Sequence, residues 1–398
     1  MMGIFSRFKL PVILLLLGII LQSVSVGVRG VRYGQDSNDY FSCFDDVRAD
    51  GYTAFIFKNR INKYFFYCFT GGTLLKLFGS RDFAVKTLIF LQILAAGSIP
   101  CLLFLTLRRT SPSAAVCAAL FAFILPDFYG WTPYLLTDTF FFFANACILL
   151  VVSKIHYLNR FPQLFAAAFL IFLCTVTRVT GLMFSLFLGM ILVLFYYASG
   201  FHKSRMVAVK KMGFFLCGFG LIPVVIFYVV GLSGGGILSN KGVDFIDNIS
   251  LGNIFYGLEG GPRVDIHTSE GGFVFVMDML KLFAARAFYF FMPAYNHHSL
   301  RHQLINTVIF LPLYVFAIRG VYAVIRKRLK VYYLPVIAAG AMIVYHMFIN
   351  MYVNVEPDHR FLIPVFPGII MLASLGFCSF FYGEKITRAS SVQGLQSR

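Results

Sequence analysis

Apolar runs long enough to cross a membrane recur along the chain from Pro11 to Tyr382, and no other feature constrains its fold as much. Hydrophobic residues make up 59% of the 398 positions, whereas charged residues make up 13%. Because about 20 apolar residues cross a bilayer as a helix, the pattern predicts an all-α polytopic membrane protein. We expect ten spans, at 10–28, 85–107, 112–128, 134–153, 163–177, 180–198, 211–231, 304–324, 331–350 and 361–382.

The charges of the linkers predict which side of the membrane each one faces. The linkers after alternate spans are short and basic, and together with both termini they form one side. The positive-inside rule predicts that this side is the cytoplasm, in a bacterial inner or plasma membrane. Every Asp and Glu except Glu384 then lies outside. Long outer loops that hold more polar residues and an outward-facing acidic active site both explain this asymmetry.

The formal net charge of +17 does not indicate a nucleic-acid partner. About half of the basic residues lie beside spans, where they meet anionic headgroups, and no basic-aromatic stripe for single strands is present. We therefore expect membrane lipids as partners. The first span also resembles a signal peptide. Its apolar run from Pro11 to Val28 is long for one, which favours an uncleaved anchor.

Two predicted outer loops, 29–86 and 233–303, are too long to be simple turns. In the second loop, Met277–Tyr295 is apolar but carries three charges, which predicts an amphipathic helix in the outer interface rather than a span. Similar interfacial segments are predicted at Tyr64–Phe69 and Leu74–Phe78. We expect one integral membrane domain over 1–387 and a disordered cytoplasmic tail over 388–398.

Cysteines and histidines give little sign of a metal site. Six of the eight cysteines lie in or beside spans, which is typical of buried apolar residues. Cys43 and Cys68 share the first outer loop, where in an oxidising compartment they either pair or stay reduced. The cluster of His297, His298, Arg301 and His302 before the eighth span suits a metal or phosphate, but solvated loop histidines are the favoured interpretation.

Two carboxylates follow the first span within a few residues. Asp36 and Asp39 are three positions apart, so they share one face if this stretch is helical. A carboxylate here can take the proton of an acceptor hydroxyl as a general base. The alternative is a solvated loop start, in which either residue is a helix N-cap.

A first span, then Gly34-x-Asp36-x-x-x-Tyr40 and a large outer loop, resembles the polyprenyl-phosphate-sugar-dependent membrane glycosyltransferases of the GT-C class. Protein O-mannosyltransferases and lipid A aminoarabinose transferases belong to it. The resemblance implies a GT-C-like bundle of about ten transmembrane helices, with Asp36 at the position of the catalytic base. The Glu that usually follows is replaced by Ser37, and the next acid is Asp39, so the choice between the two stays open.

Two further segments resemble motifs of this class, and the resemblance extends from Gly34 to about Tyr382. Thr177–Gly181 resembles an Arg-Pro-Thr-Gly turn, with valine in place of proline. Asp358–Pro367 resembles an Arg-Tyr-x-x-Pro-x-x-Pro opening of a late span, with phenylalanine in place of tyrosine.

Arginines in these two segments are candidate ligands of the donor phosphate. Arg360 lies at an outer span end, and its guanidinium fork matches phosphate geometry. His359 can add a hydrogen-bond donor. Arg178 lies at another outer span end. The alternative for both arginines is snorkelling, in which a span-end side chain merely reaches water.

An aromatic segment with the only tryptophan, Trp131, lies between Asp127 and Asp138. Its rings suit an interface belt better than sugar stacking. Asp138 lies a turn into the fourth span, where a carboxylate is costly and indicates function. Together with Tyr40, these two acids complete the predicted substrate-binding residues.

The sequence therefore predicts an inverting transferase, which moves a sugar from a polyprenyl-phosphate donor to a hydroxyl of a glycan, lipid or protein acceptor outside the cytoplasm. No cofactor is needed, because phosphate is a good leaving group, although a divalent metal is compatible. A transporter or flippase of a lipid-linked glycan predicts charged spans and inverted repeats, and neither is evident. A glycan polymerase or ligase is chemically close, but predicts a larger late outer loop than 351–360.

Overall fold

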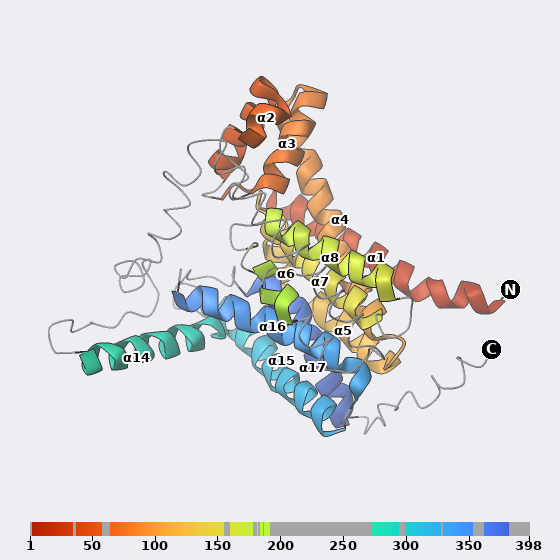
Figure 1. Cartoon of the computed structure of the whole chain (residues 1–398). Helices are drawn as coiled ribbons and strands as arrows, with labels where there is room; N and C mark the ends of the chain where they lie inside the picture. Colours follow the sequence, from red (N-terminus) through yellow and green to blue (C-terminus); the bar gives the residue numbers. More distant parts are fainter. Residues whose placement is uncertain are drawn as a thin grey trace.

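The computed structural model describes residues 2–34, 37–57, 64–154, 160–177, 181, 184–185, 187–191, 272–293, 299–327, 329–352 and 362–381. Every named element in these ranges is a helix, and the helices pack into a bundle (Figure 1). The predicted all-α polytopic membrane fold is confirmed. The number of spans stays a prediction, because 192–271 lies outside the described residues, and so does more than half of the expected span 180–198.

Five described helices are long and apolar enough to cross a membrane. They coincide with predicted spans and are α1 (Met2–Arg29), α4 (Arg81–Leu107), α15 (Leu300–Arg326), α16 (Lys330–Tyr352) and α17 (Phe366–Phe381), the last preceded by the 3-10 turn η3 (Ile363–Val365). Three shorter helices occupy other predicted spans: α5 (Pro112–Ile124), α7 (Asp138–Lys154) and α8 (Arg160–Thr177).

The structure corrects two predicted span boundaries. The helix expected over 112–128 breaks at Leu125, which is extended (φ −75°, ψ 112°) because the following proline disfavours the helical conformation. The short helix α6 (Pro126–Gly130) follows the break. The next helix begins at Asp138 and not at Tyr134, because Tyr134 and Leu135 hydrogen-bond outside the helix.

Close glycine contacts join two pairs of long helices. A Cβ added at Gly18 of α1 would collide with the backbone of Gly97 in α4, and one at Gly376 of α17 would collide with the backbone carbonyl of Phe316 in α15. Small residues allow backbones to approach closely in membrane bundles, where van der Waals packing drives helix association. These contacts hold α1 to α4 and α15 to α17.

A second, smaller core lies beyond the bundle, between α2 (Ser37–Phe57), α3 (Phe65–Phe78) and the start of α4 (Figure 1, top). The predicted interfacial segments Tyr64–Phe69 and Leu74–Phe78 form most of the single helix α3, whose buried face packs on α2. Gly71 and Gly72 leave room for Phe44 and Val47 of α2. Cys43 and Cys68 are both buried in this core, and whether they pair stays a prediction.

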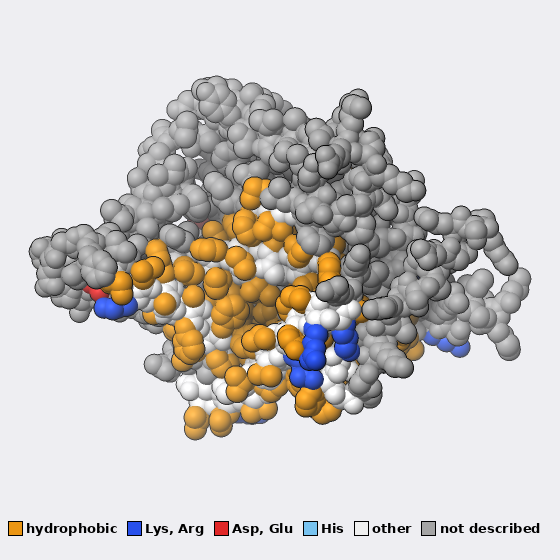
Figure 2. Space-filling view, turned by 60° about the horizontal axis from the view of Figure 1, so that its bottom comes forward, with side chains coloured by type: hydrophobic (Ala, Val, Ile, Leu, Met, Phe, Trp, Pro, Cys, Tyr) orange, Lys and Arg blue, Asp and Glu red, His pale blue; other side chains and the backbone are white. Residues whose placement is uncertain are grey.

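The helix directions give the bundle two chemically different ends. The ends of α1 and α16 and the start of α7 lie with α2 and α3, at what we call the α2/α3 end. The basic residues that terminate α4, α7 and α15 lie at the opposite end: Arg108, Arg109, Lys154, Arg326 and Lys327. Figure 2, with the bottom of Figure 1 turned forward, shows a broad apolar surface on which Lys and Arg gather in a few patches.

The helix α14 (Gly272–Phe290) occupies the segment predicted to be interfacial. It is not among the described helices that are long and apolar enough to cross a membrane. It extends to one side of the bundle in Figure 1 and packs against α16. Its position relative to the membrane stays a prediction.

Candidate functional site

The segment that follows α1 is fixed to the segment that precedes α7. The Arg32 amide donates to the Pro133 carbonyl, and the Leu135 amide donates to the Arg32 carbonyl, both at 2.9 Å. The Ser37 hydroxyl accepts from the Gly34 amide at 2.9 Å and donates to the Leu135 carbonyl at 3.5 Å. The start of α2 therefore lies beside the chain that leads into Asp138.

The side chain of Gln92 holds this junction from α4. Gln92 is fully buried, and its amide nitrogen donates to the Thr132 carbonyl at 3.1 Å and to the Tyr134 carbonyl at 2.8 Å. Its amide oxygen accepts from the Tyr67 hydroxyl at 2.7 Å. Burial raises the pKa of Tyr67 well above its usual value, because desolvation penalises the phenolate. The Tyr67 hydroxyl therefore stays neutral and keeps donating to Gln92. The network links α3, α4 and the segment that precedes α7.

The two candidate bases lie at the start of α2. Asp39 is in the first turn of the helix, and its side chain is exposed. Asp36 lies outside the described residues, between Gly34 and Ser37, which are held as described above. Tyr40 is fully buried, with its ring 4.8 Å from that of Tyr64 and 4.9 Å from that of Tyr67. In this packing Tyr40 anchors α2 on α3, and a contact of Tyr40 with substrate stays a prediction.

Asp138 is buried in the first turn of α7, with 1% of its surface exposed. The helix N-terminus stabilises a carboxylate at this position. Beside it, Thr137 is fully buried, and its hydroxyl has no hydrogen-bond partner among the described residues. Asp127 lies in α6, whose backbone is held by α1: the Gln22 amide donates to the Phe128 carbonyl at 3.4 Å, and the Ser25 hydroxyl donates to the Tyr129 carbonyl at 2.8 Å.

The Pro-rich motif is attached to the same helix as Asp138. Asn145, two turns further along α7, is fully buried and donates to the Pro364 carbonyl at 2.7 Å. This bond fixes the described part of the motif to α7. His359 and Arg360 precede Leu362, the first described residue of the segment, and lie outside the described residues. Arg178 also lies outside them.

A buried arginine on α14 is the feature that sequence reasoning missed. Arg286 is only 1% exposed and is the largest fully buried side chain among the residues that the structure describes. One terminal nitrogen, Nη1, donates to the Met351 carbonyl at 3.0 Å, whereas Nε and Nη2 have no hydrogen-bond partner among the described residues. The Asn350 side chain donates to the Arg286 carbonyl at 3.3 Å, which docks α14 on the end of α16.

Burial lowers the pKa of Arg286, because desolvation penalises the charged form. An arginine nevertheless stays protonated near neutral pH. A buried cation without an anion costs several kcal/mol, so the two unused donors favour an anionic ligand. The only signal in the sequence is indirect, a cation within an apolar stretch, and the charged edge of an amphipathic helix is the simpler interpretation of it.

Arg286 and Asp138 approach the α2/α3 end on neighbouring helices. The ring of Phe141 in α7 lies 5.7 Å from that of His346 in α16. Asp138 is one turn from Phe141 toward this end, and Asn350, the partner of Arg286, is one turn from His346 in the same direction. The structure therefore gathers a buried carboxylate, a buried guanidinium and the start of α2 at one end of the bundle.

Among the described residues, no group of three or more His, Cys, Asp or Glu side chains has the arrangement of a metal site. His302 and Arg301 lie near the start of α15, whereas His297 and His298 lie outside the described residues. Whether a divalent metal takes part stays a prediction.

The architecture is similar to that of a membrane enzyme of known structure. ArnT from Cupriavidus metallidurans, bound to undecaprenyl phosphate, superposes with a TM-score of 0.58 and 15% sequence identity over 93% of this chain. ArnT in the apo state gives a TM-score of 0.52 at 15% identity. The chain spans 60% of the length of that protein. No family model and no curated protein sequence matches this chain. The chain therefore has the GT-C fold of ArnT, a lipid A aminoarabinose transferase, as its sequence motifs predicted.

Proposed function

We propose that this protein is an inverting glycosyltransferase, which transfers a sugar from a polyprenyl-phosphate-linked donor to an acceptor hydroxyl on the extracytoplasmic side of the membrane. The observation that carries the proposal is the fold, shared over 93% of the chain with a protein crystallised with undecaprenyl phosphate. The buried guanidinium of Arg286 supports it independently, because it supplies unused donors for an anion at the α2/α3 end.

The reaction is a single displacement. Asp36 or Asp39 takes the proton of the acceptor hydroxyl, and the acceptor oxygen attacks the anomeric carbon from the face opposite the phosphate. The bond between the anomeric carbon and the phosphate oxygen breaks as the new glycosidic bond forms, so the anomeric configuration inverts. The products are the glycosylated acceptor and a polyprenyl phosphate, whose added negative charge needs cationic donors.

Arg286 is our candidate for holding that phosphate, together with Arg360 and His359 from the segment that precedes α17. Arg178 is a further candidate. A guanidinium matches phosphate oxygens with parallel donors and keeps its charge through the reaction. Asp138 and Asp127 are candidates for binding sugar or acceptor hydroxyls. Arg286 has the strongest support among these cations, because its burial and its unused donors are described.

The test is a transfer assay on the full-length protein in nanodiscs, with radiolabelled polyprenyl-phosphate sugars and candidate glycan, lipid and protein acceptors. We expect one polyprenyl phosphate to be released for each sugar transferred, with an inverted anomeric centre in the product. Movement of intact donor across the bilayer without transfer would instead support the flippase alternative. Reporter fusions at Arg109 and Asp50 test sidedness, and we expect cytoplasmic and outer signals respectively.

A further inference from the structure

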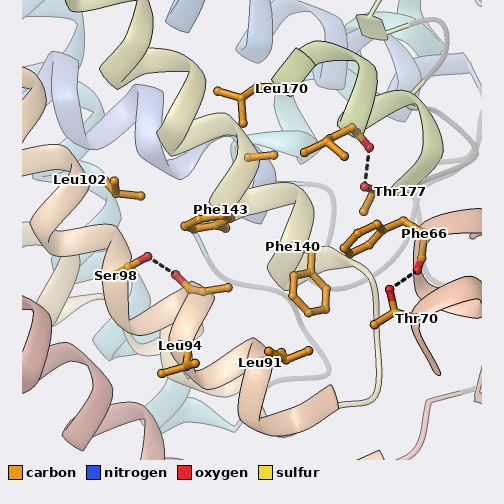
Figure 3. Close-up of a pocket in the computed structure, with 13 residues that line it drawn as sticks. Phe66, Thr70, Leu91, Leu94, Ser98, Leu102, Phe140, Phe143, Leu170 and Thr177 are labelled. Atoms are coloured by element: carbon orange, nitrogen blue, oxygen red, sulfur yellow. Dashed lines mark hydrogen bonds between the residues drawn. The ribbon is translucent and has the colours of Figure 1, made fainter. Parts of the chain in front are cut away.

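The helix α3 has two different faces. One face, with Phe66 and Thr70, borders an apolar groove of about 550 Å³ between α4, α7 and α8 (Figure 3). The groove is lined mainly by leucine and phenylalanine side chains, and the Thr70 hydroxyl donates to the Phe66 carbonyl of its own helix at 2.7 Å. The other face packs on α2, and its buried residues are Tyr67, Cys68, Gly71, Gly72 and Leu75. This second face brings Cys68 into the core that also contains Cys43 of α2.

Contacts between α2 and α3 define the register of the two helices. The Tyr40 ring of α2 lies 4.9 Å from the Tyr67 ring of α3. Further along both helices, a Cβ added at Gly72 of α3 would collide with the side chain of Val47 in α2. The contacts advance in the same direction along both segments, so the two helices run parallel in this part of the core.

Cys43 and Cys68 lie between these two contacts. Cys43 is one turn before Val47, and Cys68 is one turn before Gly72, so each shares a helix face with the residue that makes the contact. Since Gly72 has no side chain, the two backbones approach closely here. Both cysteines are buried, with 9% and 3% of their surface exposed, and both side chains are thiols in the structure. The register therefore makes them neighbours across the interface, the arrangement that a disulfide requires.

The location of this pair favours oxidation. It lies at the α2/α3 end, opposite the end at which basic residues terminate α4, α7 and α15. The positive-inside rule predicts that the basic end is cytoplasmic, so the α2/α3 end is predicted to face outward. Disulfides form and persist in oxidising extracytoplasmic compartments, whereas the cytoplasm keeps thiols reduced.

A second pair of thiols lies toward the basic end and provides a comparison. The Sγ atoms of Cys117 in α5 and Cys378 in α17 are 3.6 Å apart. Cys117 is in the second turn of α5, close in sequence to Arg108 and Arg109. Proximity alone therefore predicts a bond in this pair too, whereas the predicted sidedness predicts that it stays reduced.

We propose that Cys43 and Cys68 form a disulfide that joins α2 to α3, and that Cys117 and Cys378 remain thiols. The oxidant is the disulfide bond of an exported thiol oxidoreductase. The thiolate of one cysteine attacks that bond, forms a mixed disulfide and releases one oxidoreductase sulfur as a thiolate. The second cysteine thiolate attacks the sulfur of the first, so the new S–S bond forms and the other oxidoreductase sulfur leaves. The two cysteines lose two electrons and two protons, and the oxidoreductase becomes a dithiol.

Burial determines when the bond forms and what it does. The packed core shields both thiols, so oxidation precedes the final packing of α3 on α2, and the finished bond is shielded from reductants. A cross-link between the helices removes open conformations of the chain that connects them. The bond therefore restrains the start of α2, which carries Asp39. It forms independently of sugar transfer, so it goes beyond the proposed function.

Peptide mapping of the full-length wild-type protein under non-reducing conditions tests the bond. Bacterial cells that express the protein are denatured in the presence of N-ethylmaleimide, so thiols are trapped before air oxidises them. We expect one linked pair of peptides that contains Cys43 and Cys68, and alkylated Cys117 and Cys378. Cys43→Ala should abolish the link and leave Cys68 alkylated. Cys117→Ala is the matched control and should keep the link.

Hydrogen exchange separates a covalent link from packing alone. The amides of α2 and α3 should exchange at least about tenfold faster in Cys43→Ala than in Cys117→Ala, because the cross-link no longer opposes opening. Wild-type protein that is reduced in denaturant, refolded and kept reduced should show the same increase, although it keeps every side chain. Unchanged exchange in the reduced wild type would contradict the restraint on α2.

Two mapping results would overturn the proposal. Alkylation of both Cys43 and Cys68 in the wild type would exclude the bond. A link between Cys117 and Cys378 as well would show that proximity, and not the compartment, determines oxidation. Neither result bears on sugar transfer, so failure of this proposal is distinguishable from failure of the proposed function.

Discussion

The two sides of α7 at the α2/α3 end differ in chemistry. On one side, Phe140 faces α3 and a groove whose surface is almost entirely hydrocarbon. On the other side, Phe141 packs against His346 of α16, and the same helix pair leads to Asn350 and the guanidinium of Arg286. Successive helical residues point about 100° apart, so one turn of α7 separates an apolar site from a polar one. The comparison shows that one helix start can present an apolar surface and a polar surface in different directions.

The largest effect should come from the candidate bases at the start of α2. Asp36→Asn keeps the size of the side chain but cannot accept a proton, so turnover should fall by roughly two to four orders of magnitude if Asp36 is the base. Donor binding should persist, because phosphate recognition is assigned to other residues. Single-turnover kinetics with labelled donor measures both quantities.

Asp39→Asn is the matched variant. A comparable fall in turnover in Asp39→Asn, with near-normal turnover in Asp36→Asn, would assign the base to Asp39. Wild-type rates in both variants would exclude both carboxylates as the base and contradict the proposed mechanism.

The polar side can be tested separately at Arg286. Arg286→Ala should weaken binding of undecaprenyl phosphate by about 10- to 150-fold, the worth of a hydrogen bond to a charged group. Arg286→Lys should recover only part of it, because a point charge lacks the fork. Native mass spectrometry measures the affinity. Lys281→Ala is the control, since it removes an exposed cation from the same helix.

Thermal unfolding without ligand separates this role from a structural ion pair. If Arg286 has no anionic partner in the ligand-free protein, Arg286→Met, which keeps most of the buried volume, leaves the melting temperature unchanged or raises it, because a costly buried cation is removed. If an acidic residue of 353–361 pairs with it, the variant should lose about 3–5 kcal/mol of stability, because a buried charge is left without its partner. A loss of stability, together with unchanged affinity for undecaprenyl phosphate, would show that Arg286 has a structural role and does not bind the phosphate.

The Gln92 network should matter for stability more than for chemistry, because it holds the junction between the two sides. Gln92→Leu leaves two buried carbonyls and one hydroxyl without their partner, which should cost about 1–3 kcal/mol. Hydrogen exchange should also rise at 131–136. Thr87→Ala is a suitable control, because its hydroxyl bonds only within α4. Equal stability of the two variants would show that the junction does not depend on Gln92.

The smallest effect is expected at the pair of Arg81 and Asp45, which links α4 to α2 away from both sides of α7. Both side chains are about half exposed, so Asp45→Ala should change stability by at most about 1 kcal/mol. Salt should reduce even that difference. A loss comparable to that of Gln92→Leu in the same unfolding assay would mean that this surface pair supports the junction.

Much of the fold was predictable, because hydropathy is a local property. A long apolar run needs no partner to be recognised, and five predicted spans coincide with long helices. The break at Leu125 also has a local cause in Pro126, but a span predicted from hydropathy alone passed over it. The late start of α7 depends largely on distant residues, because the Leu135 amide donates to the Arg32 carbonyl and the Gln92 side chain donates to the Tyr134 carbonyl.

The candidate site was predictable only in part. The motifs predicted Asp36, Asp39 and the Pro-rich segment as parts of the site, because a motif consists of residue types in a given order. The burial of Tyr40 was not evident, because a tyrosine in a polar loop becomes a core residue only when α3 packs on α2. The burial of one face of α3 was not evident either, because the sequence predicted two segments on a membrane surface.

By itself, the sequence determined that the chain is a membrane-embedded helical bundle, that short basic linkers follow alternate spans, and that its motifs follow the GT-C order. Only the tertiary structure decided that Arg286 is buried with unused donors, that α2 lies beside Asp138, and that four helices enclose an apolar groove. The physical reason is range: hydropathy and turn chemistry act between near neighbours in the chain, whereas burial, hydrogen-bond satisfaction and cavity shape depend on residues that only folding brings together.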